Sequence, residues 1–273
     1  DRYRVEKEIG CGTFGKVYMC IAETHHHPGR NRQTHMSRVQ PNLERRKVAI
    51  KMIRKVKKYV NSAIVEADIL DDINSYPEGR LHFVNLYDHF AFHGHYSLVF
   101  EPLGYSLYDV LKINGYEGFP YPYVTDLAEQ ILEGVSFLAR KNLIHTDLKP
   151  ENILFVDRNP LVAFCHRTYH RRGGRTKRRR RLKTSVDGVI YGENPFFEKR
   201  VTGDDDDSVY KNSGILLPSW TRIKIIDLGG ATYDYSHKSS IINTRQYRGP
   251  EVILGLPWSY PSDIWSVGCI VAD

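Results

Sequence analysis

The chain has 273 residues, and 41% of them are hydrophobic, which is enough to bury one large core or two modest ones. It contains no apolar run near the roughly 18 residues that a membrane-spanning helix needs, and its first ten residues are charged rather than apolar. Its four cysteines lie far apart, without metal-ligand spacing. We therefore expect neither secretion nor a membrane span, and we interpret the cysteines as reduced intracellular thiols.

The net charge of +7 belongs to one segment. Nine of the 39 Lys and Arg lie in residues 171–183, which hold no acid; the remaining 30 nearly balance 32 Asp and Glu. No aromatic residue interrupts this basic run, so it does not indicate stacking on nucleic-acid bases. It fits a nuclear import signal or a solvated spacer. We expect a monomer located in the nucleus and cytoplasm, without direct nucleic-acid binding.

Taken in chain order, the first hundred residues predict a sheet with one helix. Residues 3–22 alternate apolar and polar positions around a glycine cluster, and 47–53, 82–87 and 96–101 are also strand-like. Residues 63–73 place apolar side chains at helical spacing. The polar, His-rich residues 24–46 read as an insertion. We predict an N-terminal lobe over residues 1–100.

A break at residues 101–104, with Pro102 and Gly104, predicts a hinge. The apolar stripe of residues 123–139 then predicts a helix, and strand-like runs at 153–156 and 222–228 flank a long polar interruption. We expect this interruption, residues 157–221, to be a mostly disordered insertion. The class is α+β, with a mostly helical second lobe over residues 105–273.

Gly10, Gly12 and Gly15 form a G-x-G-x-x-G turn. Glycines allow a backbone turn to approach phosphate groups closely. Alone the motif is weak, because a plain turn or a dinucleotide-binding loop would fit equally well. A dinucleotide-binding loop, however, requires a helix directly after the glycines, and here a strand is predicted.

Lys51 lies in the apolar strand Val48-Ala49-Ile50-Lys51, where an unpaired ammonium would be costly to bury. Nucleotide phosphates, together with the carboxylate of Glu66 from the predicted helix, would satisfy this charge. A lysine at a sheet edge that reaches solvent is an equally good interpretation of this residue taken by itself.

The most specific motif is His145-Thr146-Asp147-Leu148-Lys149-Pro150-Glu151-Asn152. In it Asp147 can accept the proton of an attacking hydroxyl, Lys149 can neutralise a transferred phosphoryl group, and Asn152 can bind a metal ion. Asp227 follows a buried strand directly before Leu228-Gly229, which suits a Mg²⁺ ligand. A surface turn with chance polar residues is a poor alternative once spacing is counted.

These motifs, with Arg248-Gly249-Pro250-Glu251 and Ser262-Asp263-Ile264-Trp265-Ser266, occur in the order found in protein kinases. The segments HTDLKPENILF, DLGGATYD and NTRQYRGPEVILG most resemble the LAMMER, or Clk, kinases of the CMGC group. This resemblance implies a bilobal kinase fold and ATP-dependent, Mg²⁺-dependent phosphorylation of Ser/Thr, with Tyr as a further acceptor, in Arg/Ser-rich proteins such as splicing factors. The alternatives are a DYRK-like kinase, although the activation-segment tyrosine of that family would fall at Ile241, and a pseudokinase scaffold.

The resemblance also implies residue roles. Lys51 and Glu66 would anchor the nucleotide, Asp147 would be the catalytic base, assisted by Lys149, and Asn152 and Asp227 would hold Mg²⁺. The glycine loop would cover the phosphates, and a further set would surround the adenine ring: Val17, Ala49, Phe100, Glu101, Leu103 and Leu154. Core packing is an alternative role for the apolar members of this set.

Three departures from the kinase pattern stand out. Thr146 replaces the arginine that many kinases use to clamp a phosphorylated activation loop, so we predict activity without obligatory loop phosphorylation. Leu228 and Gly249 are small changes that leave Asp227 and Glu251 in place. The chain ends at Asp273, inside the expected second lobe, so we expect a single partial kinase domain over residues 1–273 that is unstable or inactive alone.

Overall fold

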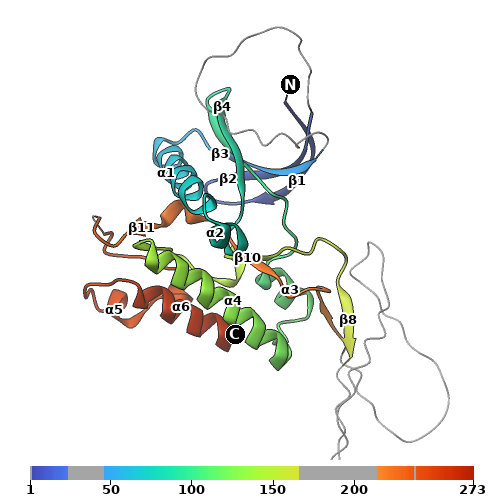
Figure 1. The fold of residues 1–273 in the computed structure, drawn as a ribbon, viewed down its shortest axis with the longest axis vertical. Coiled ribbons are helices and arrows are strands. Elements are labelled where there is room, and N and C mark those ends of the chain that lie inside the picture. Colours follow the sequence, from blue (N-terminus) through green and yellow to red (C-terminus); the bar gives the residue numbers. More distant parts are fainter. Residues whose placement is uncertain (1, 24–45, 166–213, 237) are drawn as a thin grey trace, which may run out of the picture.

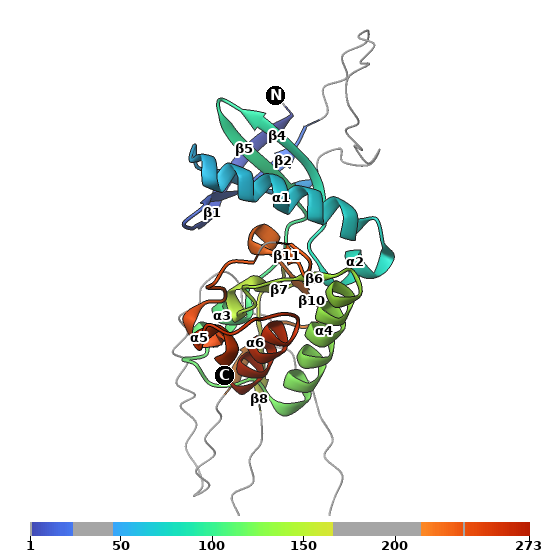
Figure 2. The same cartoon turned by 90° about the vertical axis from the view of Figure 1, so that its left-hand side faces the viewer.

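The computed structural model describes residues 2–23, 46–165, 214–236 and 238–273. These residues form two lobes, one above the other in Figure 2. The first is a sheet covered by helix α1 (Lys57–Asn74), and the second contains helices α4 (Tyr121–Arg140) and α6 (Pro261–Ala272). The predicted α+β class, with an antiparallel sheet in the first lobe, is confirmed.

Five antiparallel strands make the sheet of the first lobe, in the order β1-β2-β3-β5-β4. Their bounds are β1 (Tyr3–Cys11), β2 (Gly15–Ala22), β3 (Lys47–Ile53), β4 (Leu86–Phe92) and β5 (His95–Phe100). The apolar stripe of α1, including Ala67, Leu70 and Ile73, is buried. Residues 24–45 of the predicted insertion at 24–46 lie outside the described residues.

The strand predicted at residues 82–87 is wrong in position. Helix α2 (Pro77–His82) precedes it, and β4 begins only at Leu86. Pro77 at the first helical turn and Glu78 beside it both favour a helix start. Only glycine fits at position 79, because a Cβ there would clash with the carbonyl oxygen of Ile73, at 1.9 Å. The chain therefore makes a short second helix against the end of α1 before it returns to the sheet.

The second lobe begins with α3 (Leu107–Ile113), which the sequence analysis did not predict. Its start is a capping box: Ser106 Oγ accepts from the Asp109 backbone N–H at 3.0 Å, and the Asp109 carboxylate accepts from the Ser106 N–H at 3.0 Å. Other regular segments of this lobe are β6 (Leu143–Ile144), β7 (Ile153–Phe155), β10 (Ile223–Ile225), β11 (Thr232–Tyr233), α5 (Pro250–Ile253) and 3-10 turns at Pro150–Asn152, Leu228–Gly230 and Arg245–Tyr247.

The two ends of the predicted insertion at 157–221 contain regular strands, while the expectation of disorder for the rest of it falls on residues outside the described part of the chain. Strands β8 (Val162–Cys165) and β9 (Gly214–Leu217) pair in antiparallel register, with Cys165 opposite Gly214. The Asn114 side chain at the end of α3 fixes this ribbon: its amide nitrogen donates to the Leu216 carbonyl (2.8 Å), and its oxygen accepts from the Leu216 N–H (2.7 Å). Residues 166–213 lie outside the described part of the chain.

One buried cluster joins the two lobes. It contains Leu70 of α1 and Leu98 of β5 from the first lobe, and Leu138 of α4 and Ile225 of β10 from the second. Phe83, fully buried after α2, belongs to the same cluster. Burial of these side chains is the main force that holds the lobes together. In the described part of the chain, no helix combines the length and apolarity needed to span a membrane.

Candidate active site

The glycine loop lies in the turn between β1 and β2, with Gly12 N–H bonded to the Gly15 carbonyl at 2.9 Å. A Cβ at Gly15 would lie 2.0 Å from the Met52 carbonyl oxygen, so the position requires glycine for packing against β3. A Cβ at Gly12 would meet no atom within 4 Å. The backbone at Gly12 is therefore open to a ligand, while Gly15 secures the base of the loop.

Lys51 projects from β3 between two carboxylates. Its ammonium donates to Glu66 Oε2 of α1 at 2.9 Å and to Asp227 Oδ1 at 2.8 Å. Burial alone would lower the pKa of Lys51, but Glu66 and Asp227 more than offset this and raise it above its ordinary value. Burial would raise the pKa of Asp227, yet the adjacent Lys51 ammonium brings it below its ordinary value. The lysine is thus held charged, and the solvent-reaching alternative is excluded.

Asp147 sits at the centre of a compact polar set. Its Oδ2 accepts from Lys149 Nζ at 2.7 Å, while its Oδ1 accepts from the Thr244 hydroxyl at 2.7 Å and the Thr244 N–H at 3.1 Å. Lys149 Nζ also donates to the Thr244 hydroxyl at 3.0 Å. The carboxylate and the ammonium are therefore held in one orientation by the same threonine.

Asn152 and Asp227 are placed beside this set. The Asn152 amide nitrogen donates to the Asp147 carbonyl oxygen at 2.9 Å. Asp227, two residues after the end of β10, has a left-handed backbone conformation with φ 65°, and such conformations are costly for residues other than glycine. Oxygen atoms from a carboxylate and an amide are the ligands that Mg²⁺ prefers. The donor chemistry of the pair thus fits the ion that the resemblance implied.

The loop that carries Asp147 is held in place by hydrogen bonds from its backbone to a buried carboxylate. Asp263 of α6 accepts from the backbone N–H groups of His145 at 2.7 Å and Thr146 at 3.0 Å, and burial raises its pKa. These bonds hold Thr146 at φ 71°, an uncommon conformation for a β-branched residue. The Thr146 hydroxyl in turn donates to the Gly230 carbonyl at 2.8 Å. The catalytic-loop backbone is thereby tied to the segment after Asp227.

A cavity of about 400 Å³ connects these groups. Lys51, Glu66, Asp147 and Asp227 line it, together with Phe14 of the glycine loop and residues of the segment 239–244. Lys149 and Asn152 do not line it, but both are hydrogen-bonded to Asp147, which does. The structure therefore brings together, from both lobes, the residues to which the sequence analysis assigned phosphate transfer.

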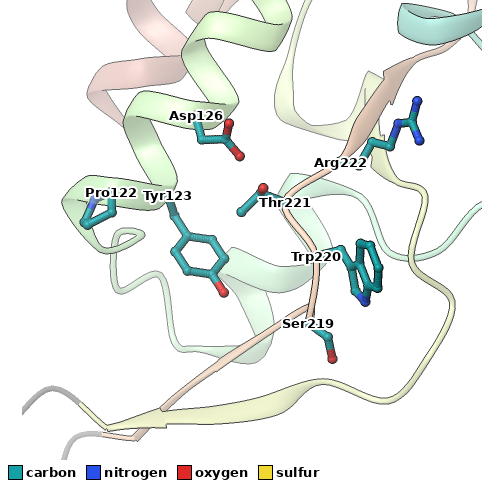
Figure 3. Close-up of a pocket in the computed structure, with 7 residues that line it drawn as sticks. All are labelled: Pro122, Tyr123, Asp126, Ser219, Trp220, Thr221 and Arg222. Carbon is teal, nitrogen blue, oxygen red and sulfur yellow. The ribbon is translucent and has the colours of Figure 1, made fainter. Parts of the chain in front are cut away.

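The predicted adenine-binding residues do not line this cavity in the described structure. Ala49 and Phe100 are buried, and Val17 and Leu103 pack against the same cluster; Leu154 is partly buried and forms a bridge with Ser106. Their roles toward a nucleotide stay predictions. A separate hollow of about 430 Å³ lies between the start of α4 and residues 219–222, where Trp220 is 70% exposed (Figure 3), and it contains no predicted site residue.

The side chain of Glu101, which the sequence analysis also assigned to the nucleotide site, is bonded to other residues of the protein. Its carboxylate pairs with Lys224 of β10 and accepts from the Asn85 N–H at 2.8 Å. The Glu101 side chain is bonded to these partners and its N–H donates to the Asn85 carbonyl, so only the main-chain carbonyl of this residue is left for an adenine ring.

Sequence reasoning missed two residues that organise the site. Thr244 and Asp263 both lie in segments quoted for their resemblance to kinases, but their side chains received no role. The sequence marks both residues only by their place in these segments. Thr244 lies 97 residues after its partner Asp147, and Asp263 lies 117 residues after its partner Thr146, so these contacts become visible only in the folded structure.

Comparisons with known proteins agree with this geometry. A model of the protein kinase domain matches residues 29–164 and 210–273. Over 272 residues the chain is 34% identical to "Serine/threonine-protein kinase AFC1" of Arabidopsis thaliana, covering 100% of this chain and 47% of that protein. It is 35% identical over 274 residues to "Dual specificity protein kinase CLK2" of Homo sapiens, covering 100% and 43%.

Among solved structures, a crystal structure of a kinase domain superimposes with a TM-score of 0.72 and 32% sequence identity. That match covers 99% of this chain and 63% of the other. The chain spans about half the length of the curated relatives it matches. The predicted similarity to Clk-type kinases is confirmed, because the relatives found include a kinase of this type.

Proposed function

Because this chain belongs to the protein kinase domain family, we propose that it transfers the γ-phosphoryl group of ATP to Ser or Thr hydroxyls of proteins. The observation that carries this proposal is the convergence of Lys51, Glu66, Asp147 and Asp227 on one cavity, with Lys149 and Asn152 bonded to Asp147. A scaffold that had lost catalysis would not need this complete set. Phosphoryl transfer depends mainly on such positioning and on electrostatic stabilisation.

Each side chain has a distinct task in this proposal. Lys51 pairs with nucleotide phosphates, and Glu66 keeps its ammonium in place. Asp147 orients the substrate hydroxyl and accepts its proton, while Lys149 neutralises negative charge on the phosphoryl group as it is transferred. Asn152 and Asp227 would hold Mg²⁺, which supplies positive charge against the phosphate oxygens when bound.

Replacement of Asp147 by Asn tests the proposal. The variant removes the proton acceptor but keeps the shape of the side chain, so we expect phosphate transfer to fall by at least about 10²-fold with ATP affinity within a few-fold of wild type. Turnover is measured with labelled ATP, and affinity by calorimetry, on the protein at its full natural length. Asp71→Asn, at a largely exposed site on α1, is the matched control. Wild-type turnover in Asp147→Asn would disprove the assigned role.

For the substrate class we propose Arg/Ser-rich proteins such as splicing factors, with Tyr as an additional acceptor. The support is the sequence similarity to Clk-type kinases, one of which is named a dual specificity kinase. Peptides with Arg-Ser and with Lys-Ser repeats, at equal net charge, separate recognition of guanidinium groups from general attraction to positive charge. We expect a kcat/KM at least about tenfold higher for the Arg-Ser peptide. Equal values would leave a kinase with another specificity, including a DYRK-like one.

We also propose that the protein acts as a monomer in the nucleus and cytoplasm. The nuclear location is supported by the basic run at residues 171–183, which lies outside the described part of the chain. Replacement of its nine Lys and Arg by Gln should shift a fluorescently tagged protein toward the cytoplasm. An unchanged nuclear fraction would show that the run is a spacer.

A further inference from the structure

A buried lysine lies at the junction of the two lobes, outside the set that the proposed reaction uses. Lys224 occupies the middle of β10, between the buried residues Ile223 and Ile225, and is itself only 6% exposed. A lysine so deeply buried is costly unless its charge is paired. Its partner is Glu101, the first residue after β5, so the ion pair joins the hinge to a strand of the second lobe.

Glu101 also binds the first lobe. Its carboxylate accepts from the Asn85 N–H at 2.8 Å, and its own N–H donates to the Asn85 carbonyl at 3.1 Å. The residue before Asn85 continues the junction, because the Val84 N–H donates to the Ile225 carbonyl at 3.1 Å. Figure 1 shows β10 beside α2, the helix that leads into this segment. A single carboxylate thus connects the hinge, the segment between α2 and β4, and β10.

β10 leads directly into the candidate active site. It ends two residues before Asp227, and the Ile226 N–H donates to the Asn152 carbonyl at 2.9 Å. Both candidate metal ligands are therefore connected through main-chain bonds to the strand that holds Lys224. A shift of the hinge relative to β10 would move the adenine-binding backbone relative to Asn152 and Asp227.

We propose that Glu101 and Lys224 are positioning residues that hold the hinge in register with Asn152 and Asp227, and so set the affinity of the protein for ATP. This inference rests on the proposed function, since it concerns the nucleotide of that reaction. The ion pair coexists with the formed Lys51–Glu66 and Lys51–Asp227 contacts, which places it in the arrangement that binds nucleotide rather than in one that excludes it.

Three changes at the hinge ion pair test the proposal: Lys224→Met, Lys224→Arg, and the double change Glu101→Gln with Lys224→Met. The double change removes both charges and leaves neither unpaired in the interior, so thermal stability should largely recover relative to Lys224→Met. Affinity for ATP should not recover, because the connection between hinge and β10 is still missing. A residue that served stability alone would regain both properties together.

The measurements are the dissociation constants of ATP and of adenosine by calorimetry, together with the melting temperature of the full-length protein. We expect Lys224→Met and the double variant to weaken both ligands about fivefold to tenfold, and Lys224→Arg to remain within about threefold of wild type. The control is Arg140→Met with Glu78→Gln, an exposed ion pair of α4 and α2 that should leave affinity unchanged.

Wild-type ATP affinity in Lys224→Met, or recovery of affinity together with stability in the double variant, would overturn the proposal. Tighter ATP binding in Lys224→Met would overturn it as well, because the ion pair would then restrain the site. Failure of the proposed function has a different signature: wild-type protein that binds ATP but transfers no phosphate leaves these affinity measurements valid.

Discussion

Thr244 takes no part in the proposed phosphate transfer, but two residues of the site depend on it for their position. Its hydroxyl donates to Asp147 Oδ1 and accepts from Lys149 Nζ, so it fixes the distance between the candidate base and the candidate cation. Without this hydroxyl, Lys149 and Asp147 would keep their mutual contact but lose their common anchor on the segment that follows Asp227.

Thr244→Val tests this dependence. Valine has the same shape but lacks the hydroxyl, so we expect kcat to fall about tenfold to a hundredfold with ATP affinity unchanged, since orientation and not nucleotide binding is lost. Thr244→Ser keeps the hydroxyl and should retain most of the activity. Steady-state phosphate transfer to a Ser peptide measures both. A valine variant as active as wild type would show that the Asp147–Lys149 pair needs no anchor.

At the scale of elements, the segment from Asp227 to Gly249 is held by several contacts that need no phosphate. The Ser62 hydroxyl of α1 donates to the Gly229 carbonyl, and the Thr146 hydroxyl donates to Gly230. Further along, the Trp258 indole N–H donates to the Ser239 carbonyl at 2.9 Å. The described residues of this segment are thus held by hydrogen bonds to α1, the catalytic loop and the turn before α6.

From these contacts we predict that activity is independent of phosphorylation in this segment. Protein treated with a phosphatase, and shown by mass spectrometry to carry no phosphate there, should keep at least about half of its kcat/KM. Thr146→Val removes only the bond to Gly230 and should lower stability by about 1 kcal/mol. Loss of more than tenfold in kcat/KM after phosphatase treatment would mean that added charge, and not these bonds, orders the segment.

Elements with a strong periodic signal were predictable, and elements defined by short local chemistry were not. α4 has a long apolar stripe and was predicted to within two residues at its start and one at its end, whereas α2 and α3 are six and seven residues long. Glu101 shows the same limit within the site. Its resemblance to a hinge residue was visible in the sequence, but its partner Lys224, 123 residues away, was not.

At the scale of the whole molecule, strands β8 and β9 form the ribbon from which residues 166–213 extend. Cys165 and Gly214 face each other at the last described pair of β8 and β9, so a two-residue turn can connect them. Replacement of residues 166–213 by Asn-Gly should leave the melting temperature within a few degrees of wild type and the rate of phosphate transfer within about twofold. An unfolded product would show that the insertion contributes to the core.

We propose that these residues together form a working phosphotransferase. The most direct measurement is transfer of labelled γ-phosphate from ATP with Mg²⁺ to an Arg-Ser peptide by full-length wild-type protein, with Asp147→Asn alongside and the modified residue located by mass spectrometry. We predict label on Ser hydroxyls with wild type and at least about a hundredfold less with Asp147→Asn. Nucleotide binding by wild type without any transfer of label would contradict the claim and favour a scaffold that has kept its site but not its reaction.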